Sequence, residues 1–388
     1  MRWLAFGTYD AQRHPRIAVL IEGLRLAGDQ VVELNEPLPL DTAARVAMLG
    51  QPWRVPLLGL RLLRCWARLI AGARRSRRDR DVDAVLVGYL GHFDVRLARR
   101  LFPDVPIVLD HLASAAGIAK DRNLARAGGP KAALMRWLDD RALRSADVVV
   151  VDTEEQARGV PAGHRDRAVV APVGAGSAWF AAAGSGASGQ ARPVADMRLV
   201  AEVRLRAIFF GLFTPLHGTE VLGAALAELA DDDRIAVTMV GTGQDYAECR
   251  RLAAGNPRVS WLDWVPADEL PALVAQHDVC LGIFGTTEKA HAVVPTKVYQ
   301  GAAAGCLVLT SDTGPQRAAL GGSAWYVPAG DSPALAGALR RLAGQPDRLP
   351  ALKSDAARWA SERFAPLTVV ASMRRAVASI QAEVDSAA

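Results

Sequence analysis

Short apolar runs rich in Val, Ile and Leu alternate along the chain with longer segments of helical pattern. Runs of this kind are typical of strands that are buried on both faces of a parallel sheet. Between the runs of the first half, the pattern predicts helices that include Arg16–Ala27 and Lys131–Arg144. The alternation predicts the α/β fold class. The six strands predicted in this half are Arg2–Phe6, Gln30–Leu34, Ala84–Val87, Ile107–Leu109, Val148–Val151 and Ala168–Ala171.

A stretch rich in Gly, Ser, Ala and Pro, Ala175–Arg198, interrupts this alternation. Two doubly wound, Rossmann-like domains are therefore predicted over residues 1–175 and 204–366, joined by a linker over residues 176–203 and facing each other across a cleft. Helices around Leu352–Phe364 and Leu367–Val384 follow the last strand, and we expect residues 367–384 to pack back on the first domain. The strands predicted in the second half are Arg206–Phe210, Ile235–Val240, Val259–Leu262, Val279–Ile283, Leu307–Thr310 and Ala324–Val327.

The composition supports two globular domains and argues against a transmembrane, secreted or metal-binding protein. The chain has 388 residues, of which 51% are hydrophobic and 22% are charged. No apolar run approaches the roughly 20 residues of a transmembrane helix, and the N-terminal run is too short for a signal peptide. The four cysteines are scattered without metal-ligand spacing, so we expect reduced thiols, no metal site and a cytoplasmic protein.

Arginine is concentrated between Arg54 and Arg80, where nine arginines face a single aspartate. Leucines and two tryptophans are interleaved with them, which predicts an amphipathic basic helix. One interpretation is a helix packed on the core that ends in a solvated basic tail. The other is peripheral contact with an anionic membrane, where each basic side chain contributes about 1 kcal/mol. Nucleic acid is not an expected partner, because no aromatic stacking platform accompanies the charge.

Loops that follow strands are where a doubly wound sheet binds its ligands. In "FFGLFTPLHGTEV" a strand ends at Gly211 and a helix begins near Gly218. The free N–H groups and positive end of that helix predict an anion site, to which His217 can add a donor.

Two more loops of the second half are weaker candidates. In "VTMVGTGQDY", Gly241 and Gly243 allow a ligand to approach the backbone, although the same pair also fits an ordinary tight turn. In "LDWVPADEL", the backbone around Val265 can reach the edge of a base, and Asp268 is placed to cap the next helix. An ordinary strand, turn and helix explains this loop equally well.

The segment "VVPTKVYQGAAAGCLVLTSD" enters a helix at Lys297 and then becomes a strand. Gln300 lies one turn later on the same face of that helix. The small residues from Gly301 to Gly305 keep the helix slender, so a ligand or another backbone can come close. Taken alone, Lys297 also fits a solvated surface charge.

Together, the order and spacing of these four loops resemble the donor-binding domain of the GT-B glycosyltransferases, particularly the retaining family four. The resemblance covers most of the chain and is strongest from Phe209 to Pro315. That family enters its small-residue helix through P-x-K-x-x-E, and the matching residues here are Pro295, Lys297 and Gln300. The resemblance implies that Lys297 binds the diphosphate of a nucleotide sugar, that Gln300 reaches the ribose, and that neither a metal nor a further cofactor is needed.

This chain departs from the family at two places. The family has two glutamates eight positions apart, where this sequence has Ala292 and Gln300. His217 stands where a lysine is common. Lys289, in "FGTTEKAHAVVPTK", can supply the missing positive charge.

The first domain offers candidate contacts for an acceptor. Gly7 and Thr8 follow the opening strand, His92 follows the third, and His14 and Arg16 lie near the same rim. We expect these five residues to line the acceptor side, although His14 and Arg16 can instead cap a helix.

The segment "IVLDHLAS" ends a strand at Asp110, with His111 beside it. Members of the family often carry a histidine here, close to the transferred sugar, and the resemblance implies that role for His111. Asp110 is its rival as the catalytic group, and a structural role for an isolated histidine stays open.

The resemblance implies a hexosyltransferase-type, retaining, metal-independent enzyme. Its acceptor would be a glycan or a lipid-linked sugar, in the synthesis of cell-surface polysaccharide or glycolipid at the cytoplasmic face of a membrane. Two alternatives stay open: a nucleotide-sugar 2-epimerase of the same fold, and a non-catalytic scaffold in polysaccharide assembly.

Overall fold

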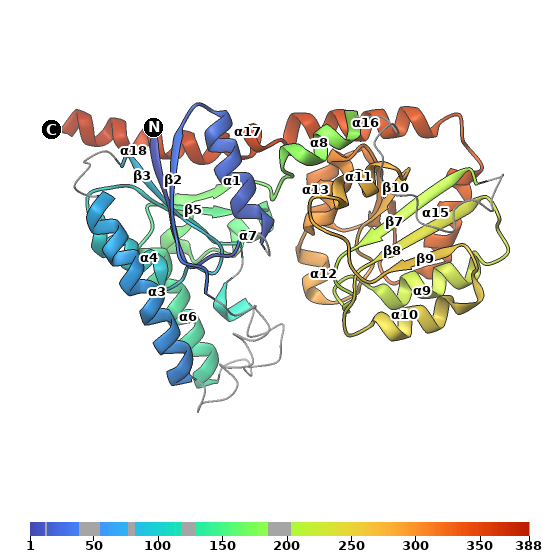
Figure 1. The fold of residues 1–388 in the computed structure, drawn as a ribbon, viewed down its shortest axis with the longest axis horizontal. Coiled ribbons are helices and arrows are strands. Elements are labelled where there is room, and N and C mark those ends of the chain that lie inside the picture. The colour runs from blue at the N-terminus through green and yellow to red at the C-terminus, as the bar shows by residue number, and fades with distance from the viewer. Residues whose placement is uncertain are drawn as a thin grey trace. The chain divides into compact units, whose positions relative to one another are not determined.

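The structure, a computed structural model, describes residues 1–11, 14–38, 55–76, 82–112, 114–117, 129–184 and 203–387. The chain forms two compact units. The first contains Met1–Pro172 together with the C-terminal segment Pro366–Ala388, and the second contains Val173–Ala365 (Figure 1). Among the described helices, none combines the length and apolarity needed to cross a membrane.

The first unit is built on a sheet of six parallel strands in the order β2-β1-β3-β4-β5-β6. Side chains alternate between its two faces, so Trp3 and Ala5 enter one core while Leu4 and Phe6 enter the other. Both faces are covered, which explains the unbroken apolar runs. The strands are β1 Arg2–Gly7, β2 Gln30–Asn35, β3 Ala84–Val87, β4 Ile107–Asp110, β5 Val148–Val151 and β6 Ala168–Val170.

Helices from both ends of the chain cover one face of this sheet. Gly23 of α1 packs directly on the C-terminal segment, because a Cβ there would lie 2.1 Å from the carbonyl oxygen of Pro366. Asp29, after α1, accepts hydrogen bonds from Arg374 at 2.7 and 3.0 Å. These helices are α1 Pro15–Leu26, α17 Pro366–Val369 and α18 Ala371–Ala387, and the opposite face is covered by α3 Val55–Ser76, α4 Asp94–Leu101 and α6 Pro130–Arg144. The short α7 Glu154–Gly159 and the 3-10 helix Ala162–Arg167 link β5 to β6.

The second unit repeats this plan with a parallel sheet in the order β12-β11-β10-β7-β8-β9. Its strand bounds are β7 Leu205–Phe210, β8 Ile235–Val240, β9 Val259–Leu262, β10 Val279–Leu281, β11 Leu307–Ser311 and β12 Ala324–Val327. One face is covered by α9 Thr219–Glu228, α10 Tyr246–Leu252 and α15 Ser332–Ala343. The other is covered by α8 Ser177–Gly184, α11 Leu270–Ala275 and α13 Thr296–Ala303. The remaining helices are the 3-10 turn Ala253–Gly255, α12 Glu288–Ala292, α14 Gly314–Leu320 and α16 Leu349–Arg363.

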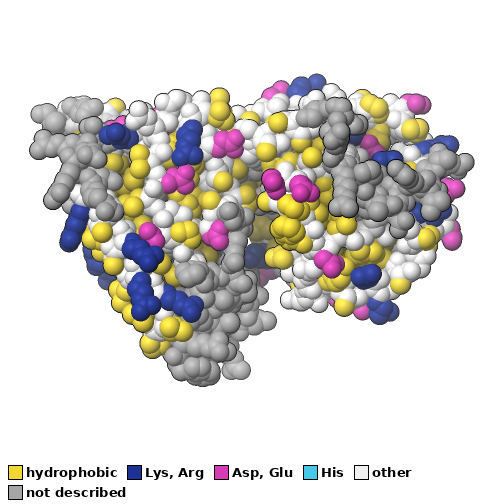
Figure 2. Space-filling view, viewed as in Figure 1, with side chains coloured by type: hydrophobic (Ala, Val, Ile, Leu, Met, Phe, Trp, Pro, Cys, Tyr) yellow, Lys and Arg dark blue, Asp and Glu magenta, His cyan; other side chains and the backbone are white. Residues whose placement is uncertain are grey.

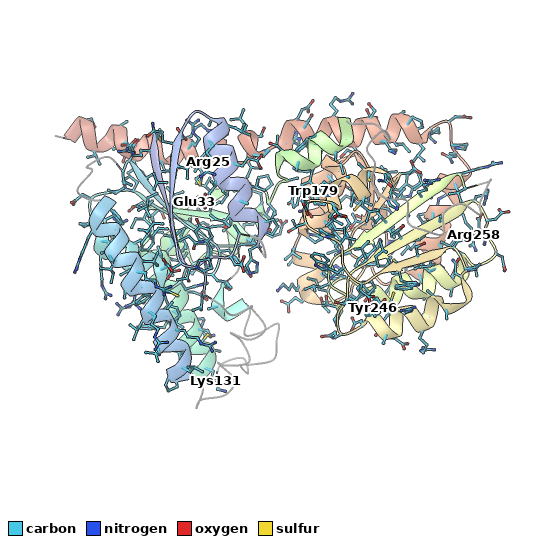
Figure 3. All side chains as sticks on the ribbon, viewed as in Figure 1. Arg25, Glu33, Lys131, Trp179, Tyr246 and Arg258 are labelled. Carbon is cyan, nitrogen blue, oxygen red and sulfur yellow. The ribbon has the colours of Figure 1, made fainter. Side chains whose placement is uncertain are left out.

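All twelve predicted strands are present, each within two residues of its predicted bounds. The last predicted helix is two helices, α17 and α18. The segment predicted as a linker begins with α8, whose Trp179 stacks on Phe210 with ring centroids 5.6 Å apart (Figure 3). Residues 185–202 of that segment lie outside the described residues.

Candidate functional site

Two glycine-bearing loops meet at the carboxyl edge of the second sheet. Gly211 follows β7 and Gly241 follows the adjacent β8, and a Cβ on Gly241 would lie 2.0 Å from the carbonyl oxygen of Gly211. A Cβ on Gly243 would lie 2.3 Å from the carbonyl oxygen of Phe213. The sequence allowed Gly241 and Gly243 either to admit a ligand or to form an ordinary tight turn, and in the structure both pack closely against the backbone of the loop after β7.

Lys297 reaches the same edge of the sheet from the start of α13. The residue is 5% exposed, and its Nζ lies 3.5 Å from the centre of the Phe209 ring. A Cβ on Gly211 would lie 3.4 Å from that Nζ, so the amino group sits directly beneath the Gly211 turn. Nζ has no hydrogen-bond partner among the described residues. Burial lowers the pKa of Lys297 well below its ordinary value.

The alternative interpretation of Lys297 as a solvated surface charge, which the sequence left open, is therefore wrong. An amino group that is buried without a partner costs stability, and an anion that reaches the Gly211 turn would supply the missing partner.

The small residues of α13 have a packing role that the sequence did not reveal. A Cβ on Gly301 would lie 2.3 Å from Sγ of Cys280 on β10. Ala303 and Ala304 are buried in the same core as Trp179 of α8. The slender face was expected to admit a ligand or another backbone, and it packs against β10 and α8. Gln300 is half-buried on the same helix.

His217 lies in the loop between β7 and α9, close to Lys297. Its Nδ1 is 3.0 Å from Oγ1 of Thr214, and its ring meets the Phe209 ring edge-on at 6.0 Å. Burial, and next the nearby Lys297, lower the pKa of His217 to about 2, so the imidazole is neutral and offers a hydrogen bond rather than a charge. Gly218 takes a φ of 63° at the start of α9, where a Cβ would lie 2.4 Å from the backbone of Phe284.

The loop after β9 is tied to the loop after β8. Tyr246, at the start of α10 (Figure 3), donates a hydrogen bond of 2.8 Å from its hydroxyl to Oδ1 of Asp263. Val265 is half-buried and packs on the core, whereas Trp264 is 75% exposed. Sequence reasoning gave Trp264 no role, although the tryptophan itself was visible in the motif.

Two further residues singled out in the second unit are Lys289 and Asp268. Lys289 is half-buried on α12 and has an interaction of its own. Asp268 does not cap α11: that helix begins after Glu269, and no side chain caps it.

In the first unit, Gly7 and Thr8 are engaged with Asp94 at the start of α4. Oδ2 of Asp94 accepts hydrogen bonds of 2.8 Å from both the backbone N–H and the hydroxyl of Thr8. Its other oxygen accepts a hydrogen bond of 2.8 Å from the indole N–H of Trp66. Gly7 has a φ of 144°, and a Cβ there would lie 3.1 Å from Oδ2 of Asp94.

Arg16 is buried, which corrects its expected place on an acceptor rim. Its Nε donates to Oδ1 of Asp110 at 2.6 Å, and its Nη2 donates to the carbonyl of Ala171 at 3.0 Å. Desolvation raises the pKa of Asp110 despite the guanidinium beside it. Desolvation also raises the pKa of Asp152, after β5, to about 6. His14 is half-buried, with its ring 4.6 Å from that of Tyr89.

His111 and His92 lie together at the carboxyl edge of the first sheet, with ring centroids 5.6 Å apart. Nε2 of His92 is 3.0 Å from Oδ1 of Asp139 on α6. Burial, and next the charge of His92, lower the pKa of His111 to about 4, so its imidazole is neutral at pH 7. The structure thus places two predicted residues beside an aspartate that sequence reasoning missed, and nothing in the local pattern marked Asp139.

The comparisons with known proteins agree with this architecture. Residues 204–345, which lie within the second unit, match the sequence model of the family described as "Glycosyl transferases group 1". The structure is similar to that of HepE from Anabaena in complex with UDP, with a TM-score of 0.65 and 16% identity, covering 97% of this chain and 99% of that one. The chain has the GT-B fold.

Other solved GT-B structures align over the same length. Sucrose-phosphate synthase from Thermosynechococcus elongatus gives a TM-score of 0.67 at 14% identity, covering 100% of this chain and 99% of that one. A structure titled "Trehalose-6-phosphate from E. coli bound with UDP-2-fluoro glucose" gives 0.66 at 13% identity, with 97% and 99% covered. No protein of curated function matches the sequence.

Proposed function

We propose that this protein is a glycosyltransferase that moves a sugar from a nucleoside-diphosphate sugar to an acceptor. The observation that carries the proposal is Lys297, whose buried amino group has no partner among the described residues and lies beneath the Gly211 turn. A diphosphate at this turn would give the amino group its counter-charge. It would also draw on the N–H groups at the start of α9.

The chemistry of glycosyl transfer fits such a site. When the bond between sugar and phosphate breaks, negative charge develops on the departing nucleoside diphosphate. The amino group of Lys297, protonated once the diphosphate is bound, stabilises that charge in a water-poor setting without needing a metal. The neutral imidazole of His217 adds a hydrogen bond there and does not compete with Lys297 for a proton.

The base would lie toward β9. Neighbouring strands are about 4.8 Å apart, so the end of β9 is about 10 Å from the end of β7, a distance that a ribose and two phosphates bridge. The exposed indole of Trp264 offers a stacking surface at that point, and the backbone around Val265 offers hydrogen bonds.

The neighbours support a nucleotide-sugar donor. The HepE structures are titled as complexes with UDP and with UDP-glucose, and the Escherichia coli structure as bound with UDP-2-fluoro glucose. The match of residues 204–345 to glycosyl transferases group 1 places the same class of chemistry in the unit that holds Lys297. A retaining, metal-independent mechanism of the family-four type, with His111 as the candidate catalytic group at the sugar, completes the proposal.

We further propose a membrane-borne acceptor, either lipid-linked or a growing surface glycan, met at the cytoplasmic face. The support is the α3–α6 surface, defined as the following exposed side chains of these two helices: the apolar Leu57, Leu60, Leu63, Leu134 and Trp137, and the basic Arg64, Lys131, Arg136 and Arg141. Figure 2 shows apolar and basic side chains interspersed over α3, and Lys131 marks the start of α6 in Figure 3. Apolar side chains within basic surroundings fit an anionic lipid surface. Arg54 and residues 77–81 lie outside the described residues.

Calorimetric titration of the protein with UDP, GDP and dTDP tests the donor site. Lys297→Met should abolish binding of whichever nucleotide the wild type binds. Lys353→Met is the matched control, because Lys353 is paired with Asp278 beside the amino end of β10, away from the carboxyl edge. If the wild type binds none of these nucleotides, the proposal of an enzyme is wrong and the protein is better interpreted as a non-catalytic scaffold. A product that stays linked to the nucleotide would establish the 2-epimerase.

Vesicle flotation tests the membrane contact separately. We expect the protein to float with vesicles that contain anionic phosphatidylglycerol and not with pure phosphatidylcholine. Neutralising Arg64, Lys131 and Arg136 to Gln should abolish flotation. The same change at three arginines of the second unit, Arg250, Arg251 and Arg341, should not. Equal flotation of both triple variants would refute the α3–α6 surface as the contact.

A further inference from the structure

A cluster of three titratable side chains in the first unit is only partly accounted for by the proposed chemistry. His92 follows β3, His111 follows β4, and Asp139 comes from α6. All three side chains are buried or nearly so. Nε2 of His92 and Nδ1 of His111 lack a hydrogen-bond partner among the described residues.

Asp139 contacts both of the loops that carry these histidines. Its Oδ1 accepts a hydrogen bond of 2.7 Å from the backbone N–H of Ala115, and its Oδ2 accepts one of 3.0 Å from Ala116. These residues lie four and five positions after His111. The same Oδ1 is 3.0 Å from Nε2 of His92, although without the alignment of a hydrogen bond. Burial alone would raise the pKa of this carboxyl, but His92 and the two N–H groups bring it below its ordinary value, so Asp139 is ionised.

Capping the segment after β4 requires only the two N–H groups of Ala115 and Ala116. The contact with His92 adds nothing to that cap, yet it places a charged carboxylate against an imidazole whose ring meets His111 edge-on. The arrangement therefore links the two histidines through one fixed anion.

We propose that Asp139 is a positioning residue, which ties the loop of His111 to the imidazole of His92 and presents the two imidazoles to the substrate as one coupled pair. The identity of that substrate rests on the proposed function. Asp139 itself lies behind the pair and acts through it. The carboxylate keeps the imidazole of His92 in place beside that of His111.

The charges around His111 determine the direction in which each substitution should shift its pKa. His92 lowers the pKa of His111 and Asp139 raises it. The neighbouring Asp110 is paired with Arg16 of α1, and Asp152 lies after β5. His92→Gln should therefore raise the pKa of His111 from about 4 toward its ordinary value, whereas Asp139→Asn should lower it further.

Nuclear magnetic resonance of the full chain with labelled histidine rings tests this inference. The chain has seven histidines, and the resonance of His111 is identified by its loss in His111→Gln. Asp140→Asn is the matched control, because Asp140 is the next residue of α6 and contacts a different histidine, His164, at 3.0 Å. Asp139→Asn should also move the ring resonances of His92, and Asp140→Asn should leave both His92 and His111 unchanged.

Turnover gives an independent readout. With a donor that the wild type uses, Asp139→Asn should lower kcat by up to about 100-fold, as misplaced catalytic groups do, while KM for the donor stays unchanged. Unchanged nucleotide-binding stoichiometry shows that the variant is folded. If Asp139→Asn fails to fold, the titration of His111 in His92→Gln tests the inference by itself.

Unchanged titration of His111 in both His92→Gln and Asp139→Asn overturns the inference, as does an equal shift in Asp140→Asn. A wild type that turns over no donor refutes the proposed function instead, and the resonance experiment still judges the pairing.

Discussion

Replacing Lys297 by Met should make the protein more stable while it destroys the donor site. The unfolded chain hydrates the amino group, whereas the folded chain buries it with no hydrogen-bond partner among the described residues. Burying a polar group without a partner costs about 1–3 kcal/mol in proteins. Methionine keeps the apolar stem against Phe209 and removes the amine.

The two aromatic contacts nearly cancel in this comparison. The wild type has an amine–ring contact at 3.5 Å, and a protonated amine in such a place contributes about 0.5–2 kcal/mol. The methionine sulfur regains about 0.3–1.5 kcal/mol on the same ring. What is left is the cost of burial, so we expect Lys297→Met to raise the free energy of unfolding by about 1–3 kcal/mol.

The pH dependence has a fixed sign. Because the pKa of Lys297 is lowered in the folded state, the unfolded chain binds the extra proton at any pH between the folded and unfolded pKa values. Wild-type stability therefore rises with pH in that window by up to about 1.4 kcal/mol per unit, relative to Lys297→Met. The advantage of the variant should shrink toward pH 10.

Urea unfolding followed by tryptophan fluorescence at several pH values measures both effects. Lys353→Met is the control: its Nζ donates to Oδ1 of Asp278 at 2.9 Å and to the carbonyl of His277 at 3.2 Å, so its removal should destabilise the protein. A Lys297→Met variant that is less stable than the wild type at every pH would show that the amino group has a partner, and the reasoning about the donor site would fail with it.

Substitutions at three other positions and one titration test the remaining structure. Nucleotide binding should take up a proton at Lys297, because a diphosphate raises the lowered pKa, and calorimetry in buffers of different ionisation enthalpy measures it; no buffer dependence contradicts this. Trp264→Ala should weaken nucleotide binding by about 1–3 kcal/mol, the usual contribution of a base stack, while Trp264→Phe should retain most of the affinity. Gly241→Ala should destabilise the second unit in thermal unfolding, because its Cβ would lie 2.0 Å from the carbonyl oxygen of Gly211. Burial raises the pKa of Asp152 to about 6 in the folded chain, so relative to Asp152→Asn the wild type should lose about 2 kcal/mol of stability between pH 4 and pH 7, and a flat difference would contradict this.

The strands and their order of appearance could be predicted because they depend on local pattern. A strand buried on both faces must be apolar throughout, and a parallel connection must pass through a helix, so twelve runs and the segments between them specified two doubly wound sheets. The position of Lys297 at the entry to α13, and of Gly211 after β7, followed from the same reading.

The surroundings of each side chain could not be predicted from the local sequence pattern. Arg16 pairs with Asp110, which is 94 positions away in the chain. Lys297 also fitted a solvated surface charge in the sequence, but in the structure its amino group is buried against the ring of Phe209. Gly301 is small because Cys280 packs on it, and Asp139 of α6 lies against His92, which is 47 positions earlier in the chain.

A periodic pattern records which face of an element is buried, but not which other element covers it. Burial, pairing and pKa depend on that partner, and the partner is chosen when the crossover connections bring strands distant in sequence to one edge of a sheet. The architecture could therefore be predicted from the sequence, whereas the burial, ion pairing and pKa values of the site residues were decided only by tertiary packing.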